Sequence, residues 1–278
     1  MSIDRITDIS ELERREADGT LLGLFDLPIE LYHAGPGVSS SGLKEILRSP
    51  AHYEDRRGNP SSSAAMRTGS VAHTLLLEPH KFKTDYAIAD CASSTAKAFE
   101  MTKLANPGKT VVCRTEAEDG SAIAKAVRAN RFASNVLLSP GGLNEVSVYW
   151  RDPDTDVLCK ARADRITRGT IADLKTTQDA RFHKFQRSVV DFKYHLSAAF
   201  YVDGFNQAIG EQHDFCWIAA ESVRPHEVAF YAADPLLIET GRAEYKLALR
   251  AYRDHVAANF IAGYPESFVN LCLPGWYQ

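Results

Sequence analysis

The spacing of apolar residues along the chain predicts a mixture of helices and strands. Apolar residues that recur at helical spacing predict helices at 42–48, 64–77, 115–138, about 188–209 and 235 to about 262. Alternation of apolar and polar residues predicts strands at 143–151, 157–166, 170–175, 213–221 and 227–232. The order of these elements predicts an α/β or α+β fold in which a mixed central sheet is flanked by helices.

The first 37 residues depart from this pattern. They show little periodicity and contain glycine and proline breakers, so we expect 1–37 to form an extended arm with one short strand. Residues 38–278 are then expected to form one domain, within which 80–113 are irregular or form short strands. Serines 39–41 are expected to cap the helix at 42–48, and Ser49-Pro50 to end it.

Composition narrows the class of protein. The chain has 278 residues, of which 45% are hydrophobic and 24% charged, as in a globular protein with a sizeable core. It contains no long apolar run, and its start lacks the basic-then-apolar pattern of a signal peptide, so we expect a cytoplasmic protein with no membrane partner. Its five cysteines are far apart, which predicts neither a disulfide framework nor a zinc or iron–sulfur site.

A predicted hairpin at 157–175 brings two carboxylates and a lysine together. Because successive strand residues point to opposite faces, Asp173 and Lys175 share one face, and Asp164 can lie across the hairpin from Asp173. Gly169 provides the positive φ that a short turn commonly requires. The pattern therefore predicts one place where two acidic side chains and one ammonium group meet.

This set of side chains suits metal-assisted hydrolysis of a phosphodiester. Mg²⁺ binds oxygen ligands, usually one or two carboxylates, and keeps waters for a substrate phosphate. A lysine beside the metal can orient the attacking water and offset the charge that builds on phosphorus, and we assign this role to Lys175. The alternative is a surface hairpin whose Asp and Lys side chains form a weak cross-strand ion pair.

The helix at 64–77 adds a histidine to this set. Gly69 and Ser70 form a small-residue face that permits a close approach to the sheet, and His73 lies one turn beyond Gly69 on that face. Imidazole is a good ligand for Mn²⁺ and a less usual one for Mg²⁺, so a ligating His73 predicts that Mn²⁺ substitutes for Mg²⁺. The alternative is a half-buried, hydrogen-bonded histidine.

Several motifs, taken in order, carry a family resemblance. They are Gly69-Ser70-Val71-Ala72-His73, Asn144-Glu145-Val146-Ser147-Val148, Lys160-Ala161-Arg162-Ala163-Asp164 and Asp173-Leu174-Lys175-Thr176-Thr177. This set resembles the PD-(D/E)XK nucleases of the RecB and lambda-exonuclease type, and in particular the nuclease domain of the RecE-type exonucleases (exodeoxyribonuclease eight). The stretches 39–43, 49–53 and 194–205 also resemble conserved segments of that group, so the likeness runs from about residue 38 to about 235.

The resemblance implies a PD-(D/E)XK restriction-endonuclease-like core and a role for each matching residue. It implies that His73, Asp164 and Asp173 bind the metal, that the Leu174 carbonyl is a further ligand, and that Lys175 is the catalytic lysine. Glu145 either lies near the metal or the DNA, or is a strand-face glutamate that faces solvent. Further candidates for DNA-binding or supporting roles are Ser41, Arg67, Lys160 and Arg162.

Tyr201 matches the tyrosine of the Gln-x-x-x-Tyr pattern found in RecB-like nucleases. The glutamine position of that pattern holds Ser197 here, which leaves the contact made by this helix open. Tyr194 or His195 could take the place of the glutamine. The alternative for Tyr201 is a core aromatic on an amphipathic helix.

The resemblance also implies an activity. It implies a metal-dependent, processive 5′-to-3′ exonuclease on linear double-stranded DNA that leaves 3′ overhangs, acts as a homo-oligomeric ring and serves a single-strand annealing protein. The formal charge of −4 gives no global attraction to DNA, so binding must depend on local basic clusters. Two other functions remain open: an endonuclease or single-strand nuclease of a defence or repair system, and a non-catalytic DNA-binding module for recombination.

Overall fold

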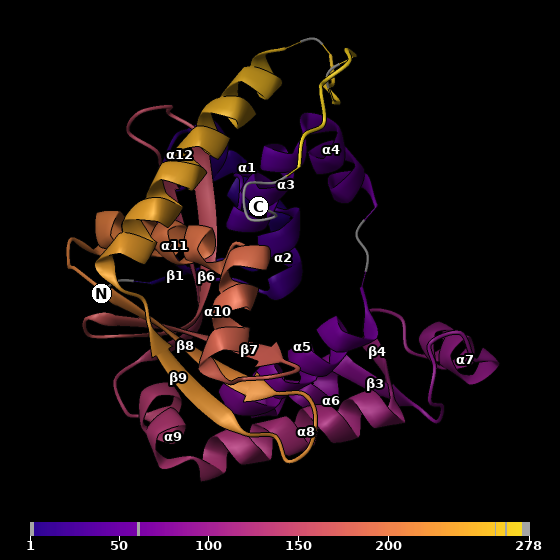
Figure 1. Cartoon of the computed structure of the whole chain (residues 1–278). Helices are drawn as coiled ribbons and strands as arrows, with labels where there is room; N and C mark the ends of the chain where they lie inside the picture. The colour runs from indigo at the N-terminus through magenta and orange to yellow at the C-terminus, as the bar shows by residue number, and fades with distance from the viewer. Residues whose placement is uncertain (1–2, 60–61, 259, 265, 274–278) are drawn as a thin grey trace.

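The computed structural model describes residues 3–59, 62–258, 260–264 and 266–273. Its centre is a mixed seven-stranded sheet with helices on both faces (Figure 1). In order across the sheet, its strands are β1 (Asp4–Arg5), β2 (Gly23–Asp26), β5 (Leu143–Arg151), β6 (Leu158–Thr167), β7 (Thr170–Thr177), β8 (Asp214–Glu221) and β9 (Val228–Ala232). The β1–β2 and β7–β8 pairs are parallel and the other pairs antiparallel, which confirms the predicted α/β fold with a mixed sheet.

The helices surround this sheet. They are α1 (Ile9–Ala17), α2 (Ile29–Ala34), α3 (Ser40–Arg48), α4 (Pro50–Gly58), α5 (Ala64–Leu77), α6 (Phe82–Asp85), α7 (Lys97–Ala105), α8 (Arg114–Ala129), α9 (Arg131–Leu138), α10 (Phe182–Asp191), α11 (Tyr194–Ile209) and α12 (Pro235–Ala257), with a 3₁₀ turn at Pro79–Lys81. None of these described helices is both long and apolar enough to cross a membrane.

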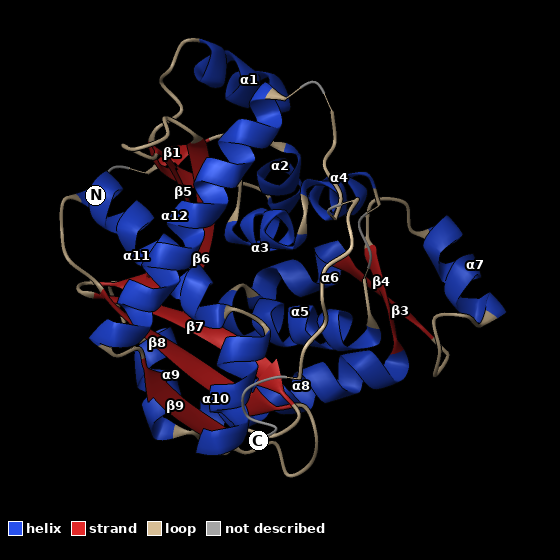
Figure 2. Ribbon diagram, turned by 45° about the horizontal axis from the view of Figure 1, so that its top comes forward, coloured by secondary structure: helices blue, strands red, loops and turns tan. Residues whose placement is uncertain are grey.

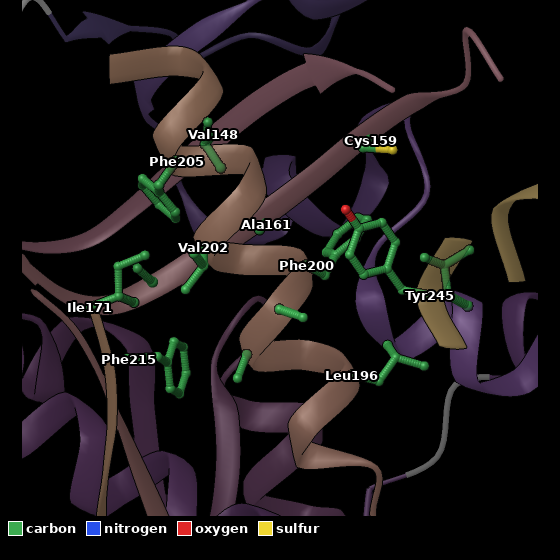
Figure 3. Packing of buried hydrophobic residues seen from close by; sticks show 14 of the residues in the cluster. Val148, Cys159, Ala161, Ile171, Leu196, Phe200, Val202, Phe205, Phe215 and Tyr245 are labelled. Carbon is green, nitrogen blue, oxygen red and sulfur yellow. The ribbon is translucent and has the colours of Figure 1, made fainter. Parts of the chain in front are cut away.

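Two hydrophobic clusters hold the helices against opposite faces of the sheet. On one face, α10, α11 and α12 pack on β5, β6 and β7, and side chains of α11 such as Phe200 and Phe205 point toward the strands (Figure 3). On the other face, α5, α8 and α9 pack on β7 and β8. Successive side chains of β7 point to opposite faces of the sheet, so this strand contributes to both clusters. Ile171 belongs to the first cluster, and Ala172 and Leu174 belong to the second.

The expectation of an extended arm at 1–37 was wrong. The described residues of this stretch form α1, α2 and two strands, and β2 pairs antiparallel with β5, so β1 and β2 extend the central sheet. Their apolar side chains form a third buried cluster with Tyr149 and Leu158. Short elements separated by glycines carry too little periodicity to be recognised from sequence.

Local capping divides several of the predicted helices. The helix expected at 115–138 is two helices, because the Asn130 side chain accepts hydrogen bonds from the backbone of Phe132 and Ala133 and begins α9. Ser49-Pro50 ends α3 as expected, but Ser49 also caps α4, which has Pro50 in its first turn. The helix expected at about 188–209 begins earlier and is interrupted between α10 and α11.

Residues 80–113 contain more structure than the pattern predicted. They form α6, α7 and a second, two-stranded parallel sheet of β3 (Tyr86–Ala89) and β4 (Thr110–Cys113). This part of the chain lies at one side of the molecule, with α7 outermost (Figure 2). A small cluster that includes Phe99, Val111 and Cys113 forms its interior.

Candidate functional site

A large cleft crosses the molecule where α2, α3, α5 and α10 approach the ends of β6 and β7. Its volume is about 2620 Å³. The predicted site residues that line it are Ser41, His73, Glu145, Lys160, Arg162, Asp164, Leu174, Lys175 and Tyr201. The structure therefore brings residues from distant parts of the sequence to one concave surface, which is where ligands commonly bind.

Three of these side chains meet at one point in the cleft. His73 of α5, Glu145 of β5 and Asp164 of β6 offer ligand atoms that all lie within 4.8 Å of one another. His73 Nδ1 lies 3.4 Å from Asp164 Oδ2, and His73 Nε2 donates to the Leu174 carbonyl at 2.9 Å. The approach of α5 that allows this depends on Gly69, where a Cβ would lie 3.1 Å from Thr176 Oγ1, whereas Ser70 is exposed.

A local distortion of the sheet places Glu145. The pairing of β5 with β6 includes Asn144↔Arg165 and Val146↔Ala163 but skips the residues between them. Glu145 and Asp164 therefore lie opposite each other without regular backbone pairing. Glu145 has φ 53°, in the left-handed region, which a non-glycine residue keeps only where its surroundings determine it. The Arg162 Nε donates to Glu145 Oε2 at 2.7 Å and holds the carboxylate in the cluster. Glu145 therefore does not face bulk solvent as an ordinary strand glutamate would.

Asp173 and Lys175 lie beside this cluster rather than within it. Lys175 Nζ lies 2.5 Å from Asp173 Oδ2, and both side chains project from β7. Between them, the Leu174 backbone N–H donates to Asp164 Oδ2 at 2.7 Å. The backbone pairing of β6 with β7 ends at Arg165↔Ala172, so this N–H binds a side chain and not the neighbouring strand. The Leu174 peptide thus fixes both Asp164 and His73.

The charges of the site are strongly coupled. Burial alone lowers the pKa of His73, but the Asp164 carboxylate outweighs it and raises the pKa to about 9. Burial would raise the pKa of Asp164, yet His73 holds it below its usual value. Burial raises the pKa of Glu145, and nearby Asp164 adds to this effect.

In the Asp173–Lys175 pair too, burial and the charge of the partner shift each pKa in opposite directions. Burial raises the pKa of Asp173 above its usual value although Lys175 opposes the change. Burial would lower the pKa of Lys175, but Asp173 and Asp164 raise it, so this ammonium group keeps its proton at neutral pH.

Residues 39–264, most of the chain, match the model of a protein family described as a PDDEXK-like domain of unknown function, DUF3799. The chain belongs to this family. The domain is similar in fold to the crystal structure of a "Putative exonuclease" from Eubacterium rectale, with a TM-score of 0.58 and 13% identity over 85% of this chain and 90% of that one.

A second solved structure, SSO0001, matches with a TM-score of 0.28 and 12% identity over 75% of this chain and 85% of that one. No curated protein matches the sequence.

The donor atoms of this PDDEXK-like domain fit a divalent metal ion. Nucleases with PDDEXK-like domains generally use such ions. Two carboxylates and one imidazole are ligands that first-row divalent ions accept, and hard ions accept the carboxylates. The close approach of the Glu145 and Asp164 carboxylates, with Asp173 beside them, is an arrangement of like charges that folding alone does not require. His73, Glu145 and Asp164 are therefore the side chains that would hold the ion.

Lys160 and Arg162 hold the segments next to the site in place through hydrogen bonds. The Lys160 ammonium group donates to the backbone carbonyls of Tyr32, His33 and Gly35, at 2.5 to 3.4 Å. Arg162 donates to the Leu27 carbonyl and to Ser147 as well as to Glu145. Both side chains are nearly fully buried, so their donors bind protein groups and hold the N-terminal segment against β6.

Arg67 also has a supporting position. It forms a buried ion pair with Glu116 of α8, at 2.6 Å, and donates to the Ser62 carbonyl. Ser41, by contrast, is exposed at the start of α3 and lines the cleft.

The departure from the Gln-x-x-x-Tyr pattern has a local explanation. Ser197 Oγ donates to Ser40 Oγ at 3.2 Å, which joins α11 to the start of α3. Tyr201 lines the cleft and also packs on Phe215 of the core. His195 points away from the cleft toward Glu244, whereas Tyr194 lines the cleft beside Lys175.

One cleft residue was missed by the sequence analysis. Lys44 of α3 lies with its ammonium group 5.6 Å from the centre of the Tyr194 ring, and the Lys175 ammonium group lies 5.3 Å from the same ring. Burial, together with the nearby Lys175 charge, lowers the pKa of Lys44 to about 7. Its only sequence signal was its helical spacing from the serine cap, which is too common to indicate a site.

Proposed function

We propose that this PDDEXK-like domain is a metal-dependent deoxyribonuclease. The observation that supports this most is the cluster of His73, Glu145 and Asp164 beside the Asp173–Lys175 pair, inside a cleft of about 2620 Å³. At such a site the negatively charged phosphate of the substrate lies close to acidic side chains. A divalent ion can bind the phosphate and the carboxylates at the same time. Mg²⁺ is the proposed ion, and Mn²⁺ should substitute because His73 offers a nitrogen ligand.

The chain's own groups have distinct parts in this proposal. A bound divalent ion supplies polarisation of the phosphoryl oxygen and activation of water. Lys175 stays protonated, donates to the attacking water or to a phosphoryl oxygen, and offsets the charge that develops on phosphorus. Asp173 orients Lys175 through their ion pair, and the Leu174 N–H orients the Asp164 carboxylate.

The cleft also offers cations for contacts with DNA phosphates. Among the residues that line the cleft away from the acidic cluster are Arg56, Arg57, Lys184 and Arg187. Such cations contact phosphates, which position a strand without reading its sequence, so we expect little sequence preference. They also provide the local positive charge that a chain of net charge −4 requires.

We further propose that the enzyme digests linear double-stranded DNA processively from the 5′ end and leaves 3′ overhangs for a single-strand annealing protein. The sequence motifs resemble RecE-type exonucleases, and the similar structure from Eubacterium rectale carries the name of an exonuclease. A homo-oligomeric ring around the duplex would keep the enzyme on DNA by topology rather than by salt-sensitive affinity.

The test is digestion of linear duplexes labelled at the 5′ or the 3′ end, with and without a 5′ phosphate, in Mg²⁺ and in Mn²⁺. We expect the 5′ label to be released first and closed-circular DNA to stay intact. Cutting of closed circles at the rate of linear DNA would identify an endonuclease instead, and preference for single strands a single-strand nuclease. Binding without cleavage in either metal would contradict a hydrolytic role and would favour the alternative of a non-catalytic DNA-binding module.

A further inference from the structure

An exposed aromatic ring lines the cleft and stacks on Tyr194, the ring next to the proposed catalytic lysine. Phe192, between α10 and α11, lines the cleft with 59% of its surface exposed. A single exposed phenylalanine is common on protein surfaces and is not by itself a site. The neighbours of Phe192 are what distinguish it.

Phe192 and Tyr194 form a stacked pair that leads to Lys175. Their ring centres are 5.6 Å apart and their planes differ by 28°. The Lys175 and Lys44 ammonium groups lie 5.3 Å and 5.6 Å from the centre of the Tyr194 ring. An aromatic surface and two lysine amino groups therefore lie next to the place where we propose that a phosphodiester is cut.

The backbone holds this pair of rings in place. Lys193, between them, has φ 50°, a left-handed conformation that costs energy for a residue with a side chain. Its ammonium group binds Glu244 Oε2 of α12 at 2.7 Å, and His195 Nε2 lies 3.2 Å from Glu244 Oε1. The Phe192 N–H also donates to the Ser188 carbonyl at 2.9 Å. The backbone that carries the two rings is thus anchored to α10 and to α12.

We propose that Phe192 and Tyr194 form a stacking platform for an unpaired base of the DNA strand next to the bond that is cut, with Lys44 contacting a neighbouring phosphate. This inference rests on the proposed nuclease function and specifies its substrate. A ring can stack only on a base whose face is free, and the faces of bases within a duplex are covered by their neighbours. The strand therefore enters the site single-stranded, from a frayed or already unpaired end.

The platform makes a quantitative prediction for cleavage. Loss of one base–aromatic stack should lower kcat/KM by about 5- to 150-fold. In Phe192→Leu we expect this loss on single strands and on duplexes with unpaired ends, whereas Phe192→Trp should keep most of the activity. The matched control is Phe182→Leu, because Phe182 is on α10, the helix that Phe192 follows, is 57% exposed and does not line the cleft.

A spectroscopic measurement separates this inference from the nuclease proposal. A single-stranded oligonucleotide with 2-aminopurine near its end should lose fluorescence on binding Lys175→Ala protein, and keep it on binding the Lys175→Ala, Phe192→Leu double variant. If wild-type protein cleaves DNA but Phe192→Leu matches it in rate and in quenching, the platform is overturned and the nuclease stands. If wild-type protein cleaves no DNA while the quenching depends on Phe192, the nuclease proposal fails and the ring is a DNA-binding surface only.

Discussion

At the scale of single residues, the function of this domain depends on charges that oppose one another across a few ångströms. The cationic His73 and Lys175 lie beside the anionic Asp164 and Asp173, and each group alters the pKa values of its neighbours. Removing one charge should therefore change the chemistry of the site more than the stability of the fold. Three predictions belong to this scale.

Lys175→Ala should lower the rate of DNA cleavage by about 100-fold or more, because it removes the cation that offsets charge in the transition state. DNA binding, measured by fluorescence anisotropy, should change little. The control is Lys125→Ala, on the exposed face of α8 and outside the cleft. Near-normal cleavage by Lys175→Ala would contradict the mechanism.

His73→Ala should weaken Mn²⁺ binding by more than about tenfold in calorimetric titration, since removal even of a group that only orients a ligand has an effect of this size. Its melting temperature should also fall, but by less than the loss of a core residue would cause, because the variant loses the ion pair with Asp164 and the hydrogen bond to the Leu174 carbonyl. His80→Ala, an exposed histidine in the same cleft, is the control. A large loss of stability with unchanged Mn²⁺ affinity would make His73 a packing residue.

Lys160 should give the fold a dependence on pH, because burial lowers its pKa to about 8. Above this value the folded protein has lost a proton that the unfolded chain keeps until its higher pKa, so stability rises with pH. Relative to Lys160→Met, wild-type protein should gain about 2 kcal/mol of unfolding free energy between about pH 7 and about pH 9.5. Urea unfolding of both proteins at the two pH values measures this gain, and a constant difference would exclude it.

At the scale of elements, the site depends on how closely α5 and α8 approach each other and the sheet. A Cβ at Gly120 of α8 would lie 2.5 Å from Val71 Cγ1 and 2.9 Å from the Thr68 carbonyl oxygen of α5. Both neighbours are buried and one is backbone, so they have little room to move. Gly120 therefore sets the position of the helix that carries His73.

Gly120→Ala should lower the free energy of unfolding by about 1–3 kcal/mol through overpacking, despite the higher helix propensity of alanine. It should also lower Mn²⁺ affinity, because α5 must shift. Gly58→Ala is the matched control, since a Cβ at that position of α4 meets nothing within 4 Å. Equal stability of the two variants in urea unfolding would show that α5 and α8 adjust without cost.

Much of the element order followed from sequence, and the misses have local causes. The strands β5 to β9 were predicted within a few residues because buried strands repeat with period two. The break at Asn130 was missed because a capping side chain ends a helix without interrupting its apolar spacing. The break between α10 and α11 was missed because it depends on the left-handed φ of Lys193, a position that no glycine marks in the sequence.

At the scale of the whole molecule, the N-terminal segment is part of the sheet and of the support beneath the site. Its carbonyl groups at 32, 33 and 35 accept from Lys160, and its apolar side chains bury Tyr149 and Leu158. A change in this segment should therefore affect the stability of the whole sheet.

Leu21→Ala should lower the free energy of unfolding by about 2–5 kcal/mol, because Leu21 is only 1% exposed in this cluster. Leu22→Ala should change it by less than about 0.5 kcal/mol, since the adjacent Leu22 is 48% exposed. Urea unfolding of the two variants tests this. Similar small effects would mean that the segment behaves as the extended arm expected from sequence.

The sequence by itself determined the α/β class, the main strands and the residue types at the site, because periodicity and motif order are properties of the chain. Tertiary structure decided which of these residues meet. It moved Glu145 into the cluster through a left-handed φ and turned Lys160 and Arg162 inward. It also placed Lys44 and Phe192 beside Tyr194. These contacts depend on helix approach and strand register across long separations, which no local pattern encodes.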